Sequence, residues 1–160
     1  MDLFGPLPES NKGDCYVLTC QDGFSKFAVA HPIPCKEAEV VANQLIETWI
    51  TKFGCPETIH SDQGTEFENK IWHALCDRLE IQKTHTPSYN PNSNIMERFH
   101  RTLNQILHVY LTHKEKSWYR YVDTAAFAYN PKINKTTMNS LRKLATLQGG
   151  LNLKITSRYL

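Results

Sequence analysis

The sequence predicts an α/β fold in which helices cover the faces of a mixed sheet. Two short segments rich in β-branched and aromatic residues flank an Asp-Gly turn, which predicts a hairpin of antiparallel strands. Two further short apolar segments alternate with segments of helical periodicity, and helical segments complete the order. Such an order is typical of a mixed sheet with helices on its faces. The 160 residues fit one domain with a sizeable core.

The hairpin is predicted from residues 15–21 and 27–33, which are joined by the turn signal Asp22-Gly23. A further strand is expected at the start of the chain, and it would carry Asp2. These three strands form the first part of the predicted sheet.

A helix over residues 36–53 is predicted next. Its apolar residues recur at helical spacing, and they are Val40, Val41, Leu45, Ile46, Trp49 and Ile50. Gly54, followed by Pro56, ends this helix.

Two short strands, residues 58–60 and 81–85, bring the expected number of strands to five. Asn69 is expected to cap a helix between them. The apolar positions of that helix are Ile71, Trp72, Leu75 and Leu79. Residues 86–94 are rich in Pro, Ser and Asn, which predicts a loop.

A long helix over residues 95–114 and a further helix over residues 118–129 are predicted last. In the long helix, one stripe at helical spacing is apolar and consists of Phe99, Leu103, Ile106 and Tyr110. A second stripe, about 200° away, is polar and consists of Glu97, Arg101, Asn104 and His108. Glu97 is therefore expected to point away from the core.

Composition excludes several classes of protein. Apolar residues make up 41% and charged residues 21%, which indicates a globular chain rather than a disordered one. No apolar run approaches the 18 or so residues that cross a membrane. The start of the chain lacks the pattern of a secretory signal, and the five scattered cysteines have no zinc-ligand spacing. We expect an intracellular protein with reduced thiols.

The charge is divided unevenly along the chain. Residues 1–80 carry 6 Lys or Arg and 13 Asp or Glu, a net of −7, whereas residues 81–160 carry 12 and 3, a net of +9, which together give the overall +2. An acidic half supplies metal ligands, and a basic half attracts phosphates. Cations expected to bind phosphates around the long helix are Lys83, Arg98, Arg101, Lys114 and Lys116.

Three acids on separate elements are the candidate site. Asp2 lies on the first strand, Asp62 follows the strand 58–60, and Glu97 lies in the first turn of the long helix. Magnesium prefers oxygen ligands and is often held by a few carboxylates plus substrate phosphates. Two such ions about 3.5–4 Å apart promote in-line phosphoryl transfer. The three acids therefore point to chemistry on a nucleic-acid backbone.

Other interpretations compete with this one. Asp14 and Asp22 each adjoin a glycine and are expected in turns, and Glu66 is expected to face solvent. Glu97 alone would also suit a solvated helix start, because an acid there is favoured by the helix dipole. The seven histidines lack zinc-ligand spacing, so core or surface roles are expected for them.

Several stretches, in their shared order, resemble the catalytic core of a retroelement integrase of the gypsy-type retrotransposon and retroviral kind. They are Asp2-Leu-Phe-Gly-Pro-Leu-Pro, Asp22-Gly-Phe-Ser-Lys-Phe, Phe53-Gly-Cys-Pro, His60-Ser-Asp-Gln-Gly-Thr-Glu-Phe, Tyr89-Asn-Pro-Asn-Ser-Asn, Glu97-Arg-Phe-His-Arg-Thr-Leu and Ala126-Phe-Ala-Tyr-Asn. The resemblance implies a ribonuclease-H-like fold with a mixed five-stranded sheet flanked by helices. It also implies trimming of the 3′ ends of element DNA and joining of those ends to target DNA.

The same resemblance implies roles for particular residues. Asp2, Asp62 and Glu97 match the catalytic triad, which binds two Mg²⁺ or Mn²⁺ ions. The positions expected to contact DNA are Tyr89, Asn92, Ser93, Arg98, Arg101 and Asn104. The expected partners are element-end and target DNA, together with further copies of the chain in a homo-oligomer.

The chain departs from the family pattern in three places. Only Met1 precedes Asp2, and the usual glycine between Asn94 and Ile95 is missing. Residues 136–160 also differ from the family's sequence, which divides the chain into a core, 1–135, and an altered C-terminal tail, 136–160. The zinc-binding and C-terminal DNA-binding domains of whole integrases are not expected in it.

Three functions remain open on the sequence. The first is an integrase-type polynucleotidyl transferase acting in the nucleus. The second is a catalytically impaired or domesticated remnant that binds nucleic acid or dimerises. The third is a ribonuclease H, which shares the fold and the metals; the loop from Tyr89 and the segment from Glu97 favour an integrase over it.

Overall fold

The structure, a computed structural model, describes residues 1–85, 93–113 and 116–130. Its first sheet is antiparallel, with strands β1 (Asp2–Phe4), β2 (Tyr16–Gln21) and β3 (Ala28–Ile33) in that spatial order. The register places Asp2 opposite Thr19, and the β2–β3 hairpin turns at Asp22-Gly23. The three predicted strands and the Asp-Gly turn are thereby confirmed.

The second sheet is parallel and consists of β4 (Thr58–Ser61) and β5 (Gln82–His85). The single five-stranded sheet expected from the resemblance is therefore not confirmed, because the five strands of the described residues form two sheets. β1 is three residues long, and among the described strands it forms a ladder only with β2. The two sheets remain linked, since the Met1 amine donates to the His60 carbonyl oxygen over 2.6 Å.

The predicted helix 36–53 is present as a continuous helical segment with an irregular middle. It consists of α1 (Ala38–Leu45), the π-helical η1 (Ile46–Ile50) and α2 (Thr51–Phe53). Gly54 ends it with φ 87°, a conformation that glycine adopts readily, and its amide donates to the Ile50 carbonyl over 2.9 Å.

Helix α3 (Lys70–Arg78) has the predicted cap. The Asn69 side-chain oxygen accepts from the amides of Ile71, at 3.0 Å, and Trp72, at 3.2 Å. The expected apolar face is confirmed at Trp72, which is fully buried and packs edge-on against Phe67. The prediction that Ile71 belongs to this buried face is wrong, because its side chain is 45% exposed.

The remaining elements are α4 (Ser93–Thr112), the 3₁₀ turn η2 (Trp118–Tyr121) and α5 (Val122–Tyr129). Helix α4 begins two residues before the predicted 95. Most of the predicted loop 86–94 and all of the tail 136–160 lie outside the described residues.

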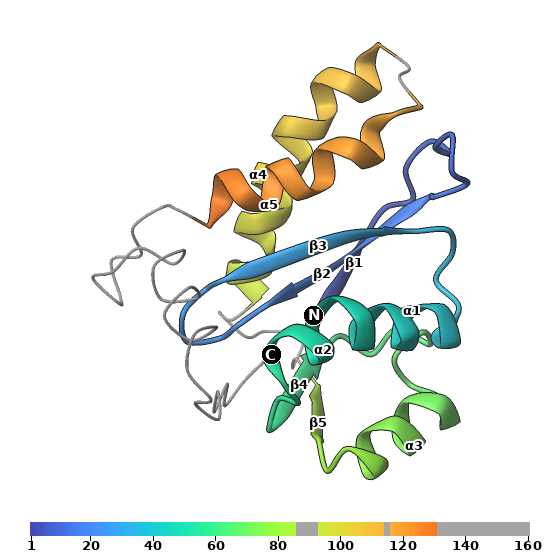
Figure 1. The fold of residues 1–160 in the computed structure, drawn as a ribbon, viewed down its shortest axis with the longest axis vertical. Coiled ribbons are helices and arrows are strands. Elements are labelled where there is room, and N and C mark those ends of the chain that lie inside the picture. Colours follow the sequence, from blue (N-terminus) through green and yellow to red (C-terminus); the bar gives the residue numbers. More distant parts are fainter. Residues whose placement is uncertain (86–92, 114–115, 131–160) are drawn as a thin grey trace.

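Two cores lie on opposite faces of the first sheet, as the alternation of side chains along β2 requires. Leu18 and Cys20 point to the face covered by α1 and α3, and Val17 points to the face covered by α4 and α5. Figure 1 shows α4 and α5 together on one side of this sheet, with α1 on the other. The acid-bearing ends of β1 and β4 meet between these layers.

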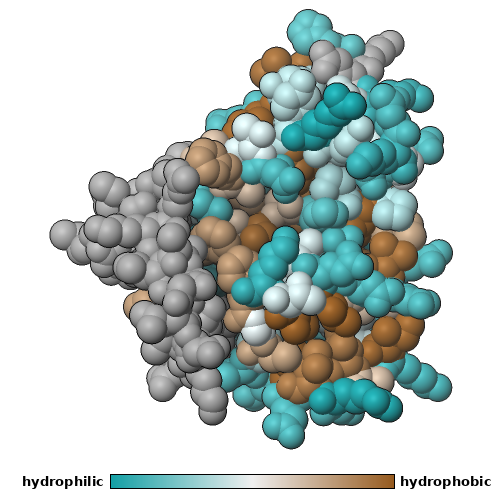
Figure 2. Space-filling view, viewed as in Figure 1, coloured by the Kyte–Doolittle hydropathy of each residue, from teal (hydrophilic) through white to brown (hydrophobic). Residues whose placement is uncertain are grey.

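The surface agrees with this layering. In the view of Figure 2, hydrophilic side chains cover most of α4 and α5, and hydrophobic ones gather nearer α1. No helix in the described ranges is long and apolar enough to cross a membrane. All five cysteines are free thiols, as expected.

Candidate active site

Asp2 is held in a polar pocket at the start of β1. Its Oδ1 accepts from the Leu3 amide over 2.7 Å, and its Oδ2 lies 3.7 Å from Nδ1 of His100 on α4. The Asp2 side chain is 36% exposed, so one side of it remains open to solvent. Burial raises the pKa of the Asp2 carboxyl, although His100 and the Leu3 amide oppose that rise.

His100 is fixed by the opposite strand. Its Nε2 lies 2.8 Å from the Thr19 hydroxyl, and that hydroxyl donates its proton to the Asp2 carbonyl oxygen over 2.9 Å. Because the Thr19 hydroxyl proton is donated to the Asp2 carbonyl, His100 Nε2 must carry the proton of the hydrogen bond between His100 and Thr19. A neutral His100 therefore presents a bare Nδ1 to Asp2, and burial lowers the pKa of His100 and favours that neutral form.

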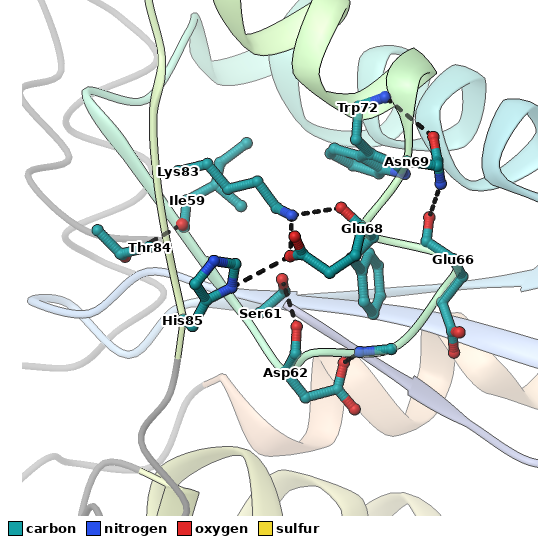
Figure 3. Close-up of polar contacts among 12 residues, drawn as sticks. Ile59, Ser61, Asp62, Glu66, Glu68, Asn69, Trp72, Lys83, Thr84 and His85 are labelled. Carbon is teal, nitrogen blue, oxygen red and sulfur yellow. Dashed lines mark hydrogen bonds and ion pairs between the residues drawn. The ribbon is translucent and has the colours of Figure 1, made fainter.

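Asp62 lies immediately after β4, at its C-terminal end, and is exposed (Figure 3). Its Oδ1 accepts from the Gly64 amide over 3.1 Å, which shapes the turn that follows the strand. The Asp62 charge contributes to the raised pKa of Asp2. The Met1 amine donates to the His60 carbonyl oxygen over 2.6 Å, so the strand ends that carry the two acids lie side by side.

Glu97 lies elsewhere, on the exposed polar face of α4. Its carboxylate pairs with Arg101 over 3.2 Å, and both side chains are about two-thirds exposed. Within the described ranges, no three His, Cys, Asp or Glu side chains are close enough together to bind a metal ion. The structure thus brings Asp2 and Asp62 together but does not gather Glu97 with them.

A buried ion pair supports the segment that follows Asp62. Lys83 of β5 is only 7% exposed, and its ammonium donates to the Phe67 carbonyl and to the Glu68 carboxylate. His85 lies 3.1 Å from the same Glu68 oxygen, so Glu68 sits between two residues of β5 (Figure 3). The expectation that Lys83 binds phosphates is therefore wrong.

The polar stripe of α4 is confirmed, because Glu97, Arg101, Asn104 and His108 are all exposed. Arg98 is exposed beside them.

The described residues leave part of the predicted interface untested. Tyr89, Asn92 and Lys114 lie outside them. Ser93 is the first residue of α4, and its side chain lies outside the description as well.

Two neighbours of Asp2, Thr19 and His100, were missed by the sequence analysis. The pairing of Thr19 with Asp2 follows from the register of β1 on β2, which no local pattern reveals. His100 did carry a signal, because it follows Phe99 at the border between the apolar and polar stripes of α4. A side chain at such a border reaches across to the sheet.

The alternative acids behave as expected in two of three cases. Asp22 Oδ2 accepts from the Ser25 amide over 2.7 Å, and Asp14 Oδ2 accepts from the Ser10 hydroxyl over 3.0 Å, so both belong to turns. Glu66 is half-buried rather than fully solvated. None of these three acids is among the charged groups that shift the pKa of Asp2.

The donor chemistry of the pair fits a hard divalent cation. Asp2 is about one-third exposed and Asp62 is exposed, so both can present carboxylate oxygens to a cation from solvent. Magnesium needs only one or two carboxylates from the protein when waters and substrate phosphates complete its shell.

Known structures define the class of fold. The catalytic core domain of BIV integrase superposes with a TM-score of 0.69 over 91% of this chain and 92% of its own length, at 23% sequence identity. The chain therefore has the ribonuclease-H-like, mixed α/β fold of retroviral integrase cores.

Sequence comparison defines the family. Residues 1–91 match the family described as "Integrase core domain", and the chain belongs to that family of integrase-type polynucleotidyl transferases. It is 34% identical over 131 residues, 81% of its length, to the retrovirus-related Pol polyprotein from transposon 412 of Drosophila melanogaster. It is 37% identical over 93 residues, 58% of its length, to the Gag-Pol polyprotein of Walleye dermal sarcoma virus. The chain spans 11% and 5% of these two relatives.

Proposed function

We propose that this chain is the catalytic core of a metal-dependent DNA strand transferase, which trims 3′ DNA ends and joins them to target DNA in the nucleus. The observation that carries the proposal is the meeting of the strand ends that carry Asp2 and Asp62, two acids from different sheets, in a chain of the integrase core family. Carboxylates gathered from separate elements supply the oxygen ligands that a divalent cation prefers.

In this proposal, Asp2 and Asp62 hold Mg²⁺ or Mn²⁺, and Glu97 completes a site for two ions. When bound, the metal lowers the pKa of a water or a 3′-hydroxyl and stabilises the charge that develops on the phosphate. Glu97 lies within a helix, so joining the site requires its side chain to leave the exposed pair with Arg101. Such an exposed pair contributes only about 0.3–0.5 kcal/mol, which substrate phosphates on Arg101 readily offset.

The residues around Asp2 orient it for this role. The Leu3 amide holds one carboxylate oxygen, and His100, anchored on Thr19, stands beside the other. In the neutral form that burial favours, His100 Nδ1 carries no proton, so it leaves the Asp2 Oδ2 lone pairs free for a cation.

DNA would lie along the exposed face of α4. Arg98, Arg101 and Asn104 would contact its backbone, because guanidinium and amide groups donate to phosphate oxygens. Tyr89, Asn92 and Ser93 are proposed as further contacts before and at the start of that helix. Both DNA ends of an element must be handled together, which favours a homo-oligomer.

One observation favours a second function, that of a catalytically impaired remnant that binds DNA without cutting it. Glu97 pairs with Arg101 instead of joining Asp2 and Asp62, and the described residues contain no three-ligand cluster. A chain that stayed in this arrangement with DNA bound would hold metal weakly.

The two functions are separated by activity on a branched DNA that mimics the joined product, with Mn²⁺ as the metal. The reverse of strand joining demands least from flanking domains, so we expect the chain to resolve this substrate. Asp62→Asn should lower the rate at least about 100-fold, because the amide lacks the ligand's charge. Asp77→Asn, an exposed acid on α3, is the matched control and should match the parent chain.

Full activity in Asp62→Asn would refute the assignment of this acid. A folded parent chain that binds the branched DNA but never resolves it would establish the remnant. Inserting glycine between Asn94 and Ile95 then tests whether the missing residue is the cause.

A further inference from the structure

The turn between β2 and β3 displays an aromatic ring to solvent. Phe24 at its tip is 73% exposed, more than the other large hydrophobic side chains exposed on the described residues, which are Ile71 (45%), Val109 (57%) and Phe127 (56%). A single exposed apolar side chain is common on protein surfaces, so its neighbours decide what it can contact.

Hydrogen bonds hold the turn in one conformation. Asp22 Oδ2 accepts from the Ser25 amide at 2.7 Å, and the Ser25 hydroxyl accepts from the Phe27 amide at 3.2 Å. Gln21 Nε2 donates to the Lys26 carbonyl at 2.8 Å and to the Tyr129 hydroxyl at 3.0 Å, which ties the turn to α5. A ring on a fixed turn loses little conformational entropy when it binds a partner.

The turn also stores backbone strain. Lys26 has φ of 62°, in the left-handed region that a lysine seldom adopts. Such strain persists where the surroundings impose it, often at binding sites. Here the Lys26 ammonium donates to the carbonyl oxygen of Gly23, the residue before Phe24.

Lys26 of this turn has a second cation in its surroundings. Arg98 of α4 lies near enough to Lys26 to help lower the pKa of the Lys26 ammonium, although burial is the larger cause and Asp22 opposes it. Neighbouring cations attract phosphates. The charge of Lys26 and Arg98 therefore favours nucleic acid as the partner of this turn.

The turn lies at the same end of the sheet as the two acids. Asp2 pairs with Thr19, and β2 continues for only two more residues before the turn. The rise of a strand places Asp22 about 10 Å beyond Thr19. Along one DNA strand that distance corresponds to about three nucleotides.

We propose that Phe24 stacks on an unpaired base of the DNA strand held at the candidate active site, with Lys26 and Arg98 on the flanking phosphates. The proposal rests on the proposed DNA-processing function and adds a base-contacting residue to it. A stacked ring holds a frayed DNA end open, so the strand that reaches the acids is single-stranded.

The test compares two fluorescein-labelled DNAs by anisotropy in EDTA at fixed salt: a blunt duplex and the same duplex with three unpaired nucleotides at one end. Phe24→Ala should weaken binding of the unpaired end about tenfold, within the range of roughly 5- to 150-fold that base stacking supports. It should leave the blunt duplex unchanged. Phe24→Tyr should restore binding, and Ile71→Ala, an exposed apolar residue on α3, is the matched control.

A second readout reports stacking directly. Trp49, Trp72 and Trp118 are all buried, so tryptophan in the variant Phe24→Trp would be the exposed fluorophore. Its emission should be quenched by the DNA with unpaired nucleotides and not by the blunt duplex.

The outcomes separate the two proposals. A parent chain that binds neither DNA refutes the DNA-processing function together with the stacking role. A parent chain that binds both DNAs, while Phe24→Ala binds them equally well, refutes the stacking role alone. Equal losses on both DNAs in Phe24→Ala also refute base stacking.

Discussion

Replacing Lys83 by methionine should destabilise the fold although it removes no apolar contact. Methionine keeps most of the apolar stem, so the change isolates the ammonium and its bonds to the Phe67 carbonyl and the Glu68 carboxylate. Breaking a buried pair costs about 3–5 kcal/mol. Glu68 is 28% exposed and keeps His85 as a neighbour, so we expect about 2–3 kcal/mol, near the value for a hydrogen bond to a charged group.

The assay is thermal and urea unfolding followed by circular dichroism. For a domain of this size the loss corresponds to a melting temperature about 5–10 °C lower. Lys70→Met is the matched control, because Lys70 is exposed at the start of α3 and should change stability by no more than about 0.5 kcal/mol. Equal stability of the two variants would refute the view that Lys83 anchors the segment after Asp62.

The same pair predicts a dependence on pH. The hydrogen bond from Lys83 lowers the pKa of Glu68, so the folded state favours the charged carboxylate. The stabilisation is present above the unfolded pKa of about 4.3 and is lost as the pH falls through the lower folded pKa. The stability difference between the parent chain and Glu68→Gln should therefore shrink as the pH falls below about pH 4. A difference that grew below about pH 4 would contradict this sign.

Two further predictions concern α5 and DNA. Asn130→Ala should lower the free energy of unfolding in urea by about 2–3 kcal/mol. The Asn130 side-chain amide makes two 2.8 Å hydrogen bonds, to the backbone N–H and C=O of Ala28, and both groups are buried. Asn43→Ala, at an exposed position, is the control, and equal stability of the two variants would contradict the anchoring of Asn130 on β3. DNA affinity should fall roughly 40-fold between about 50 and 200 mM salt if three phosphates are contacted, as measured by anisotropy; an affinity independent of salt would exclude phosphate contacts by Arg98 and Arg101.

Local patterns in the sequence predicted those elements that local interactions determine. The Asp22-Gly23 turn, the Asn69 cap and the two stripes of α4 each depend on residues within a few positions of one another. Sequence also predicted three acids as the candidate site, and the structure places the strand ends that carry two of them, Asp2 and Asp62, side by side. Their roles as metal ligands remain a prediction.

The features that sequence missed depend on contacts between distant residues. Lys83 was assigned to phosphate binding because its charge is visible in the sequence, but its burial against Glu68 is not. The neighbourhood of His100 and Asp2 joins α4 to β1 across 98 positions, and the division of the strands into two sheets depends on which distant segments pair. Periodicity carries no information about such pairings.

The outer edge of β3 has a consequence for how copies of this chain assemble. In the alternating ladder with β2, the outward backbone groups of β3 belong to Ala28, Ala30 and Pro32. The side-chain amide of Asn130 accepts from the N–H of Ala28 and donates to its carbonyl oxygen, as a neighbouring strand would. Pro32 has no N–H with which to bond another strand. An open strand edge can pair with strands from other chains. The outer edge of β3 is blocked at both of its ends, at Ala28 and at Pro32. We therefore expect copies that meet at this side of the molecule to join through helices and loops, because only the backbone groups around Ala30 are left for a strand of another copy.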